Sequence, residues 1–302
     1  MTVITAMISA GTGNDERVSV MGRFSTCVQV SWFIGPSAGS FLYKRVGERA
    51  PCVVAGGIFA LNVAVVLLCL PSTRGNNGSK KVDKEKKTPI KEIVRSNSAL
   101  LPPLLTLLLY SFVARSTSSS TLINYWETRY QVESYVRGYI MSYSSLLGLV
   151  IQWALIKPFF SRLTLRTGSV VAFWIYVSGV AVENLCQGNI WFYLGVVVPL
   201  STISFSVLQV SLKTLITTTC QKEYVSSVLA ALDVMTSCLS VMSPFYRSLI
   251  FRKIGYIDSL DEDMLFKWSW LVFGHWVAVA AISSLLLLGG KKLENNSEKK
   301  KE

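Results

Sequence analysis

The stretch Ser31-Trp32-Phe33-Ile34-Gly35-Pro36-Ser37-Ala38-Gly39-Ser40 lies in the middle of an apolar segment, residues 20–43. That segment carries a single charge, Arg23, near its beginning. About 20 consecutive apolar residues are enough to cross the hydrocarbon core of a bilayer as a helix. The segment is therefore predicted to be a transmembrane helix, and the organisation of the rest of the chain follows from it.

Two features of this stretch predict how the helix packs. Pro36 has no N–H to donate to the carbonyl of Trp32, so we expect the helix to kink or loosen there. Ser31, Gly35 and Gly39 are spaced four residues apart, which places three small side chains on one face. Such a face allows a second helix to approach closely.

The composition indicates an all-α polytopic membrane protein. Of the 302 residues, 51% are hydrophobic and only 16% are charged, against about a quarter in soluble domains. The net charge of +12 would suggest nucleic acid binding in a soluble protein. Here the basic residues lie in short connections and in the tail, so the expected partner is the lipid bilayer and not nucleic acid.

The sequence offers no support for an enzyme or a cofactor protein. The six cysteines contain no CxxC pair, and the chain has one histidine, which makes a metal site and a disulfide framework improbable. No nucleotide-binding loop, catalytic triad or paired-carboxylate site is visible. We therefore expect no cofactor, no metal and no enzymatic activity.

Eight apolar segments are long enough to be spans. They are residues 20–43, 51–70, 100–123, 138–160, 170–185, 191–212, 225–251 and 266–289. If the connection at residues 14–23 is cytoplasmic, two thirds of the 30 lysines and arginines lie on that side. The excess of basic residues predicts that the central loop and the C-terminus are cytoplasmic.

A weak internal repeat relates the first span to the seventh. Residues 15–47 align without a gap on residues 223–255, and Pro36 meets Pro244 in the middle of each helix. Both copies begin with an acidic residue and end with a basic pair and a glycine. The copies lie six spans apart and therefore share one orientation, as in transporters built from parallel six-helix repeats.

The segments DERVSVMGRFSTCVQVSWFIGPSAGSFLY, RGYIMSYSSLLGLVIQ and SLKTLITTTCQKEYVSSVLAAL carry a family resemblance. The first resembles the fifth helix of major facilitator superfamily proteins, including the Gly-Pro motif of the drug:proton antiporter branch. The other two resemble helix eight and the region of helices ten to eleven in organic-cation-transporter-like members of solute carrier family 22. The resemblance implies helices five to twelve of a twelve-helix plan, in a chain truncated at its N-terminus.

The resemblance and the repeat together imply a domain scheme. Residues 1–70 are the remainder of a first six-helix half, and residues 71–99 form a basic cytoplasmic linker. Residues 100–290 form the second half, followed by a cytoplasmic tail at 291–302. This sequence departs from the family pattern at Ser161, where the family has an acidic residue. In the second repeat copy, Ser243 and Arg247 replace Gly35 and Gly39, so the small-residue face is confined to the first copy.

Ionisable residues inside predicted spans are candidates for transport chemistry, because each costs roughly 2.5–3.5 kcal/mol at a helix centre on insertion scales. Asp233 is the acid well inside a span and is a candidate for proton uptake and release. The alternative is a structural pair with Lys213. Arg115 is a candidate partner for an anionic substrate or for Glu183, and the alternative is snorkelling to the interface.

Four more polar residues are weaker candidates. Glu183 lies near the outer surface, where it either attracts cations or is simply solvated. His275 has a suitable pKa for proton transfer, but packing in the last span is the plainer alternative. Gln152 and Gln209 are mid-span amides that either line a polar cavity or hydrogen-bond between helices.

The function implied by the resemblance is secondary transport by alternating access. The expected substrates are small organic solutes, with organic cations among them, exchanged for protons. A non-transporting membrane scaffold that keeps this fold is the main alternative, since intramembrane acids are few and Ser161 replaces the family's acid. A receptor-like helical bundle is disfavoured by the repeat and by the even number of spans.

Overall fold

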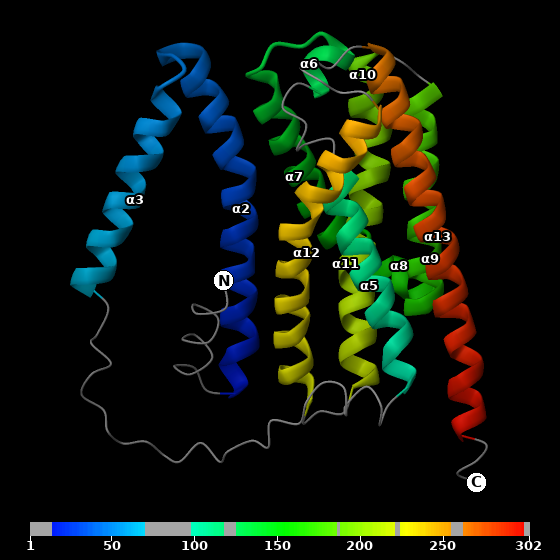
Figure 1. The fold of residues 1–302 in the computed structure, drawn as a ribbon. Coiled ribbons are helices and arrows are strands. Elements are labelled where there is room, and N and C mark those ends of the chain that lie inside the picture. The colour runs from blue at the N-terminus through cyan, green and yellow to red at the C-terminus, as the bar shows by residue number, and fades with distance from the viewer. Residues whose placement is uncertain are drawn as a thin grey trace. The chain divides into compact units, whose positions relative to one another are not determined.

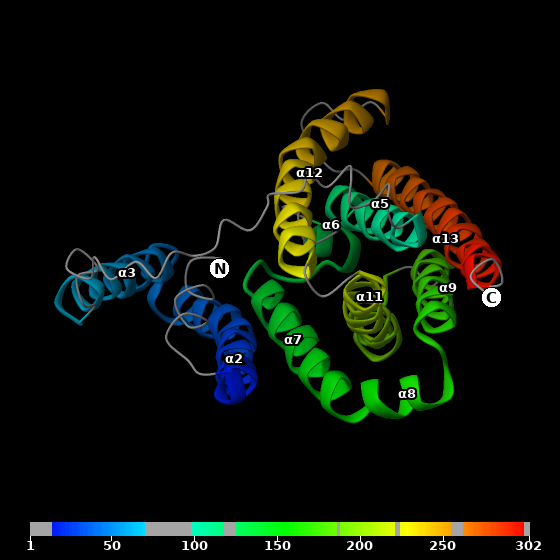
Figure 2. The ribbon, with the colours of Figure 1, turned by 90° about the horizontal axis from the view of Figure 1, so that it is seen from below.

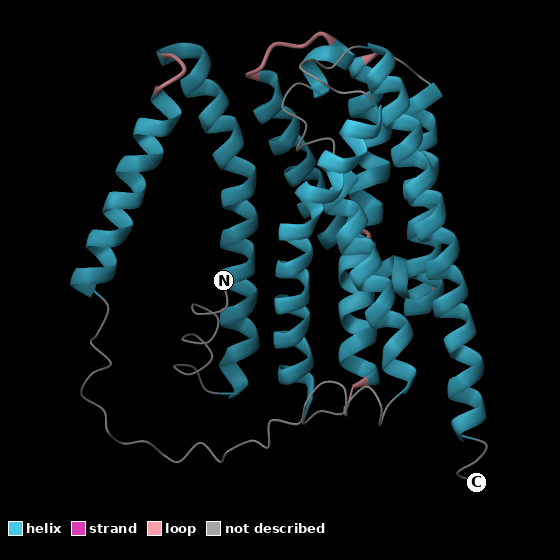
Figure 3. Cartoon of the chain, viewed as in Figure 1, coloured by secondary structure: helices cyan, strands magenta, loops and turns pink. Residues whose placement is uncertain are grey.

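The structure, a computed structural model, describes residues 14–69, 98–117, 125–185, 188–220, 224–254 and 262–298. Within these ranges every regular element is helical (Figure 3). The chain divides into two compact units, which are described separately below. The first comprises residues 1–72 and 133–150, and the second comprises residues 73–132 and 151–302.

The first unit contains a helical hairpin followed, later in the chain, by most of a third helix. Helix α2 (Asn14–Val46) and helix α3 (Ala50–Cys69) run antiparallel (Figure 1). The turn between them depends on Gly47, whose φ of +121° is in a region that side-chain-bearing residues avoid. Its N–H donates to the carbonyl of Leu42 at 3.3 Å. Residues 133–150, which include most of α7 (Val136–Ala154), also belong to this unit.

Helices α2 and α7 approach closely at a glycine of α7. A Cβ added at Gly138 would overlap the Ser40 Oγ and lie 2.5 Å from the backbone oxygen of Pro36. Ser142, one turn further along α7, donates its hydroxyl to the carbonyl of Phe33 at 2.6 Å. Helix α2 continues through Pro36 as one helix. The carbonyl that Pro36 leaves without its helical donor is that of Trp32, so the bond from Ser142 joins the two helices one residue away from it.

The close approach does not use the predicted small-residue face. A Cβ built at Gly35 or at Gly39 meets no atom within 4 Å, and the Ser31 hydroxyl donates to the carbonyl of Cys27 on its own helix. Within the described part of this unit these three residues do not contact a second helix, and the small-residue face stays a prediction. Contact is made one position further round the helix, by Pro36 and Ser40, because the glycine that permits it lies on α7.

The second unit is a bundle of long helices with short connecting elements. In chain order these are η2 (Ser98–Leu100), α5 (Leu101–Thr117), α6 (Tyr125–Tyr130), α8 (Ile156–Arg162), α9 (Leu165–Leu185), α10 (Ile190–Phe192), the π-helical η4 (Tyr193–Val197), α11 (Val198–Thr219), α12 (Val225–Ile254) and α13 (Glu262–Glu298). Helix α5 contacts α11, α12 and α13, and α9 contacts α11 and α13. Figure 2 shows α5 between α12 and α13.

Aromatic side chains fill the centre of this bundle. Trp276 of α13 is fully buried, and its ring lies 4.1 Å from that of Tyr176, 6.0 Å from that of Phe205 and 6.2 Å from that of Tyr110, centroid to centroid. Its indole N–H donates to the Thr117 hydroxyl at 3.0 Å. Four long helices, α5, α9, α11 and α13, therefore share one packed cluster.

Five helices of the described residues are long and apolar enough to cross a membrane. They are Ala50–Leu68, Leu165–Leu185, Ile190–Thr219, Ser227–Lys253 and Met264–Gly289. These segments confirm the predicted second, fifth, sixth, seventh and eighth spans as long apolar helices. The remaining three predicted spans contain α2, α5 and α7, of 33, 17 and 19 residues, which are helical without meeting that standard of length and apolarity.

The predicted fourth span, residues 138–160, is not one helix. Helix α7 ends at Ala154, and α8 begins at Ile156 after a break at Leu155. Pro158 explains the break, because it has no N–H to donate to the carbonyl of Ala154, where α7 ends. In the sequence, this proline is the local sign of the break.

A side-chain cap begins the segment that leads into α11. The Oδ1 of Asn189 accepts from the backbone N–H groups of Trp191 at 3.0 Å and Phe192 at 3.2 Å. Replacing Asn189 with alanine leaves both donors without this acceptor and is expected to cost about 1 kcal/mol of stability. Thermal unfolding of the purified variant measures the loss, and Asn189→Asp, which keeps a capping oxygen, should restore most of it. Equal unfolding temperatures for alanine variant and wild type would contradict the cap.

Candidate transport site

A polar cavity of about 480 Å³ opens in the second unit between α5, α11 and α12. Its size is in the range of small-molecule sites in proteins. We call it the arginine cavity. Its lining residues are Tyr110, Ser111, Ala114 and Arg115 of α5, Gln209 of α11, and Ser240, Ser243, Pro244 and Arg247 of α12. The cavity thus brings together Arg115, Gln209 and Pro244, three residues that the sequence analysis selected from separate spans.

Arg247 is held in place by the end of α5. Its Nε donates to the carbonyl of Ser116 at 3.1 Å, and its Nη2 donates to the carbonyl of Arg115 at 2.5 Å. The last carbonyls of a helix have no donor within the helix, and they attract a cation. The half-buried guanidinium therefore has a fixed orientation at the wall of the cavity. In the sequence it stood out only as the residue replacing Gly39 in the second repeat copy.

Arg115, unlike Arg247, is not held by hydrogen bonds to another helix. It also lies in the last turn of α5, but its side chain is exposed and forms no ion pair with any described residue. The predicted alternative of a pair with Glu183 is therefore not observed. The lining residues include two arginines and no aspartate or glutamate, so their net charge is positive.

Neutral polar groups complete the lining. The hydroxyls of Ser240 and Ser243 donate to carbonyls of their own helix, Thr236 at 2.8 Å and Leu239 at 2.7 Å. Pro244 lacks the N–H that would otherwise bond the carbonyl of Ser240. Helix α12 continues through Pro244, and the carbonyl of Ser240 is left without its helical donor.

Comparison with known proteins decides the family. The family model described as Major Facilitator Superfamily matches residues 1–244 of this chain. The chain belongs to the major facilitator superfamily. Solute carrier family 22 member 18 of Mus musculus is 23% identical to this superfamily member over 298 residues, which cover 95% of this chain and 68% of the relative. Together with the five apolar helices, the family makes this chain an integral multi-pass membrane protein. The family and the relative support a secondary transporter that acts on small molecules within the membrane.

Asp233 does not line the arginine cavity, although it lies on the same face of α12. It precedes Ser240 by seven residues and Arg247 by fourteen, which is about 10 Å and about 20 Å along a helix. A seven-residue spacing returns to nearly the same helix face. The Asp233 side chain is exposed on the second unit and forms no ion pair with a described residue. The predicted structural pair with Lys213, which is also exposed, is therefore not observed.

His275 is a packed histidine in this superfamily member. Its Nδ1 lies 2.7 Å from the carbonyl oxygen of Leu271, so Nδ1 carries the proton and donates. Its Nε2 then accepts from the Tyr246 hydroxyl at 2.5 Å. Both ring nitrogens are occupied in the neutral form, and the dyad joins α12 to α13. This geometry favours the packing alternative over proton transfer.

Glu183 is part of a polar cluster that joins α6, α9 and α13. Arg129 donates to the Ser269 hydroxyl at 2.5 Å and to the backbone carbonyl of Glu183 at 2.7 Å. Tyr130 donates its hydroxyl to the Glu183 carboxylate at 3.3 Å, and Asn184 donates to the carbonyl of Ser269 at 3.1 Å. Burial, and then the nearby Glu183 carboxylate, raise the pKa of Tyr130, so its hydroxyl stays protonated and keeps donating. Glu183 is therefore engaged by protein groups.

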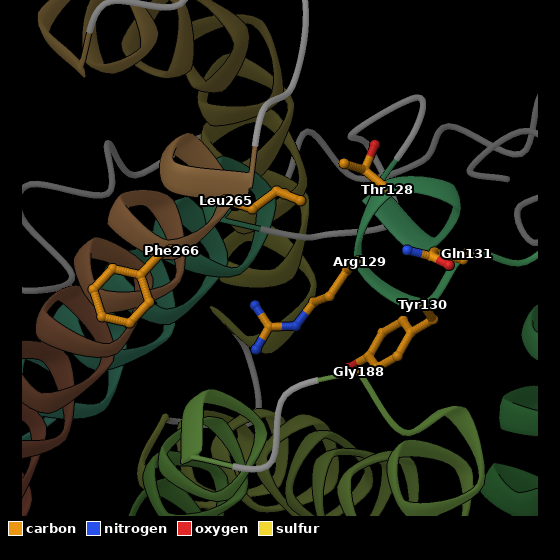
Figure 4. A pocket seen from close by; sticks show the side chains of 7 residues that line it. All are labelled: Thr128, Arg129, Tyr130, Gln131, Gly188, Leu265 and Phe266. Carbon is orange, nitrogen blue, oxygen red and sulfur yellow. The ribbon is translucent and has the colours of Figure 1, made fainter.

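A second cavity, of about 350 Å³, lies beside this cluster. Figure 4 shows the side chains of Arg129 and Tyr130 extending from α6 on the same side. The residues that line this second cavity are Thr128, Arg129, Tyr130, Gln131, Gly188, Leu265 and Phe266. Because Arg129 is already bonded to Ser269 and to Glu183, this cavity is the weaker candidate for a substrate.

Gln152, a candidate from the sequence, is exposed on α7 and does not line the arginine cavity. Tyr110 lines that cavity and was not selected from the sequence. Gly138 carries the contact between α2 and α7, and its spacing of four from Ser142 was an available signal for a small-residue face. The partnership of Arg129 with α9 and α13 had no sequence signal, because it joins segments far apart in the chain.

Proposed function

We propose that this protein is a secondary transporter that moves small organic solutes by alternating access, with protons as the coupling ion. The arginine cavity carries the proposal: it is a polar site of small-molecule size among the helices of a superfamily member. Transporters of repeat architecture bind substrate at the interface between the repeats, near the middle of the membrane. Pro36 and Pro244 lie at corresponding positions of the two repeat copies, and each removes one backbone hydrogen bond from a helix that continues through it.

Asp233 is the proposed site of proton coupling. A carboxylate inside an apolar span is expensive to keep ionised, so protonation there is readily linked to the conformation of the protein. It lies in the apolar segment Ser227–Lys253, two helical turns from Ser240 on the same face. Helix α12 therefore offers a direct mechanical link between a titratable group and the cavity.

The test is uptake by the purified protein in proteoliposomes with an imposed pH gradient. The uptake of radiolabelled organic acids and organic bases is measured with and without the gradient. Wild type is expected to concentrate at least one class when the gradient is present. Asp233→Asn is expected to abolish the response to the gradient, because an amide cannot exchange a proton, while substrate binding persists.

Glu133→Gln is the matched control, since Glu133 is an exposed acid in the connection before α7. Its uptake should follow wild type at every pH. An undiminished gradient response in Asp233→Asn would exclude Asp233 as the coupling group. Absence of uptake by folded wild-type protein, for all substrates offered, would contradict transport.

A non-transporting membrane scaffold remains the second candidate function, and Ser161 favours it. At the position of the family's acid, Ser161 donates its hydroxyl to the carbonyl of Pro158 on the same short helix, at 2.8 Å. That local bond supplies no negative charge at the position where the family has an acidic residue. The predicted domain scheme, the cytoplasmic C-terminus and the organic-cation substrates all remain predictions.

A further inference from the structure

We propose that the arginine cavity binds the anionic group of an organic acid, a carboxylate or an equivalent oxyanion, with Arg115 and Arg247 as its binding residues. This inference rests on the proposed function and names the substrate class of the same site. It reverses the cationic preference that the family resemblance implies. The charges of the described lining residues carry it.

The first step concerns the uncompensated charge of Arg115. Arg115 lines the cavity, and its exposed side chain forms neither an ion pair nor a hydrogen bond among the described residues. Arginine within a span is costly unless its charge is paired or reaches water. A bound oxyanion would supply the missing partner, and the planar guanidinium fits a carboxylate through two parallel hydrogen bonds.

The second step concerns the donors that Arg247 has left. A guanidinium has five N–H donors, of which Nε–H and one on Nη2 are bonded to carbonyls of α5. Three donors remain on a group whose orientation those carbonyls already determine. Preorganised donors of this kind bind an anion with little loss of side-chain freedom.

The third step is the absence of a competing acid. None of the nine lining residues is aspartate or glutamate. Within α12 the acid is Asp233, about 20 Å along the helix from Arg247. A cationic solute would therefore meet two positive charges and no carboxylate in the cavity. Tyr110, Ala114 and Pro244 offer apolar surface for the organic part of an acid.

The test uses two probes that match in shape and differ in charge, 3-phenylpropionate and 3-phenylpropylammonium. Binding to the purified full chain, in detergent free of anionic lipid, is measured by calorimetry and by the shift in unfolding temperature. Wild type should bind the carboxylate and not the ammonium. Arg115→Gln should weaken carboxylate binding by roughly 10- to 100-fold, the usual effect of losing a hydrogen bond to a charged group.

Two further variants make the outcome specific. Arg115→Glu should exchange the preference, so that the ammonium binds and the carboxylate does not. Arg162→Gln, at an exposed arginine of α8, should bind like wild type. Because Arg247 also caps α5, its test is Arg247→Lys, which keeps the charge and loses the forked geometry. The lysine variant should bind the carboxylate more weakly than wild type does. Its unfolding temperature should stay near that of wild type.

Several results would overturn the inference. These are equal binding of both probes, binding of the ammonium alone, or binding of neither to folded wild type. Stabilisation through Arg115 by phosphatidylglycerol but not by 3-phenylpropionate would assign the site to a lipid headgroup and reject an organic acid. Proteoliposome uptake distinguishes the two proposals. Gradient-driven uptake of ammonium alone would leave the transporter proposal standing, whereas carboxylate binding without any uptake would refute transport.

Discussion

Replacing Gly138 with alanine is expected to destabilise the protein by about 2 kcal/mol, the usual cost of forcing extra volume into a packed contact. The new Cβ would overlap the Ser40 hydroxyl and lie 2.5 Å from the backbone oxygen of Pro36. A side chain can rotate away, but a backbone carbonyl inside a helix cannot. Helices α2 and α7 would therefore have to separate, and the bond from Ser142 to the carbonyl of Phe33 would be lost with them.

Gly39→Ala is the matched control for Gly138→Ala. Both replace a helical glycine with alanine and gain about the same helix propensity, roughly 1 kcal/mol. A Cβ at Gly39 has no atom within 4 Å, so this variant should be as stable as wild type or more so. The unfolding temperatures of the two purified variants measure the difference. Combining Gly138→Ala with Ser40→Ala should recover part of the loss, because the carbonyl of Pro36 remains in the way. Two indistinguishable glycine variants would refute the close approach.

Replacing Trp276 with alanine is expected to have the largest effect on the second unit, about 3 kcal/mol. In a bilayer the hydrophobic transfer of the side chain contributes little, since lipid is itself apolar, so the loss comes from the cavity and the broken contacts. The variant removes ring contacts to Tyr176, Phe205 and Tyr110. It also removes the donor to the buried Thr117 hydroxyl. Because Tyr110 lines the arginine cavity, ligand binding should weaken as well.

Trp270→Ala is the control on the same helix. The Trp270 side chain is 43% exposed, so its removal leaves no comparable void and should cost under about 1 kcal/mol. Trp276→Phe should lie between the two, because it keeps a ring and loses the indole donor. Thermal unfolding of the three variants gives the order, and an equal loss at positions 270 and 276 would contradict a core centred on Trp276.

The residues selected from the sequence were those whose chemistry is unusual in a span, and their role in transport stays a prediction. Arg115 and Gln209 were chosen as polar groups in apolar segments, and Pro244 as the repeat partner of Pro36; all three line the cavity. His275 was expected to pack, and its two hydrogen bonds agree with that alternative. Arg247 was noticed only as a departure from the repeat, because its role depends on carbonyls of a helix 132 residues away.

Some features of the fold follow from the local sequence, and others depend on contacts between segments far apart in the chain. Length and hydropathy are local properties, and by themselves they determined five long apolar helices and the all-α membrane class. The resemblance of three segments, one of them with the Gly-Pro motif, indicated the superfamily from sequence alone, and the family match confirms it. Which face of α2 makes contact was decided by Gly138, a residue of another helix, because close packing needs a small residue at the point of approach on either side. The charge of the cavity likewise required the folded chain, since two arginines become one electropositive site only when α5 and α12 lie side by side.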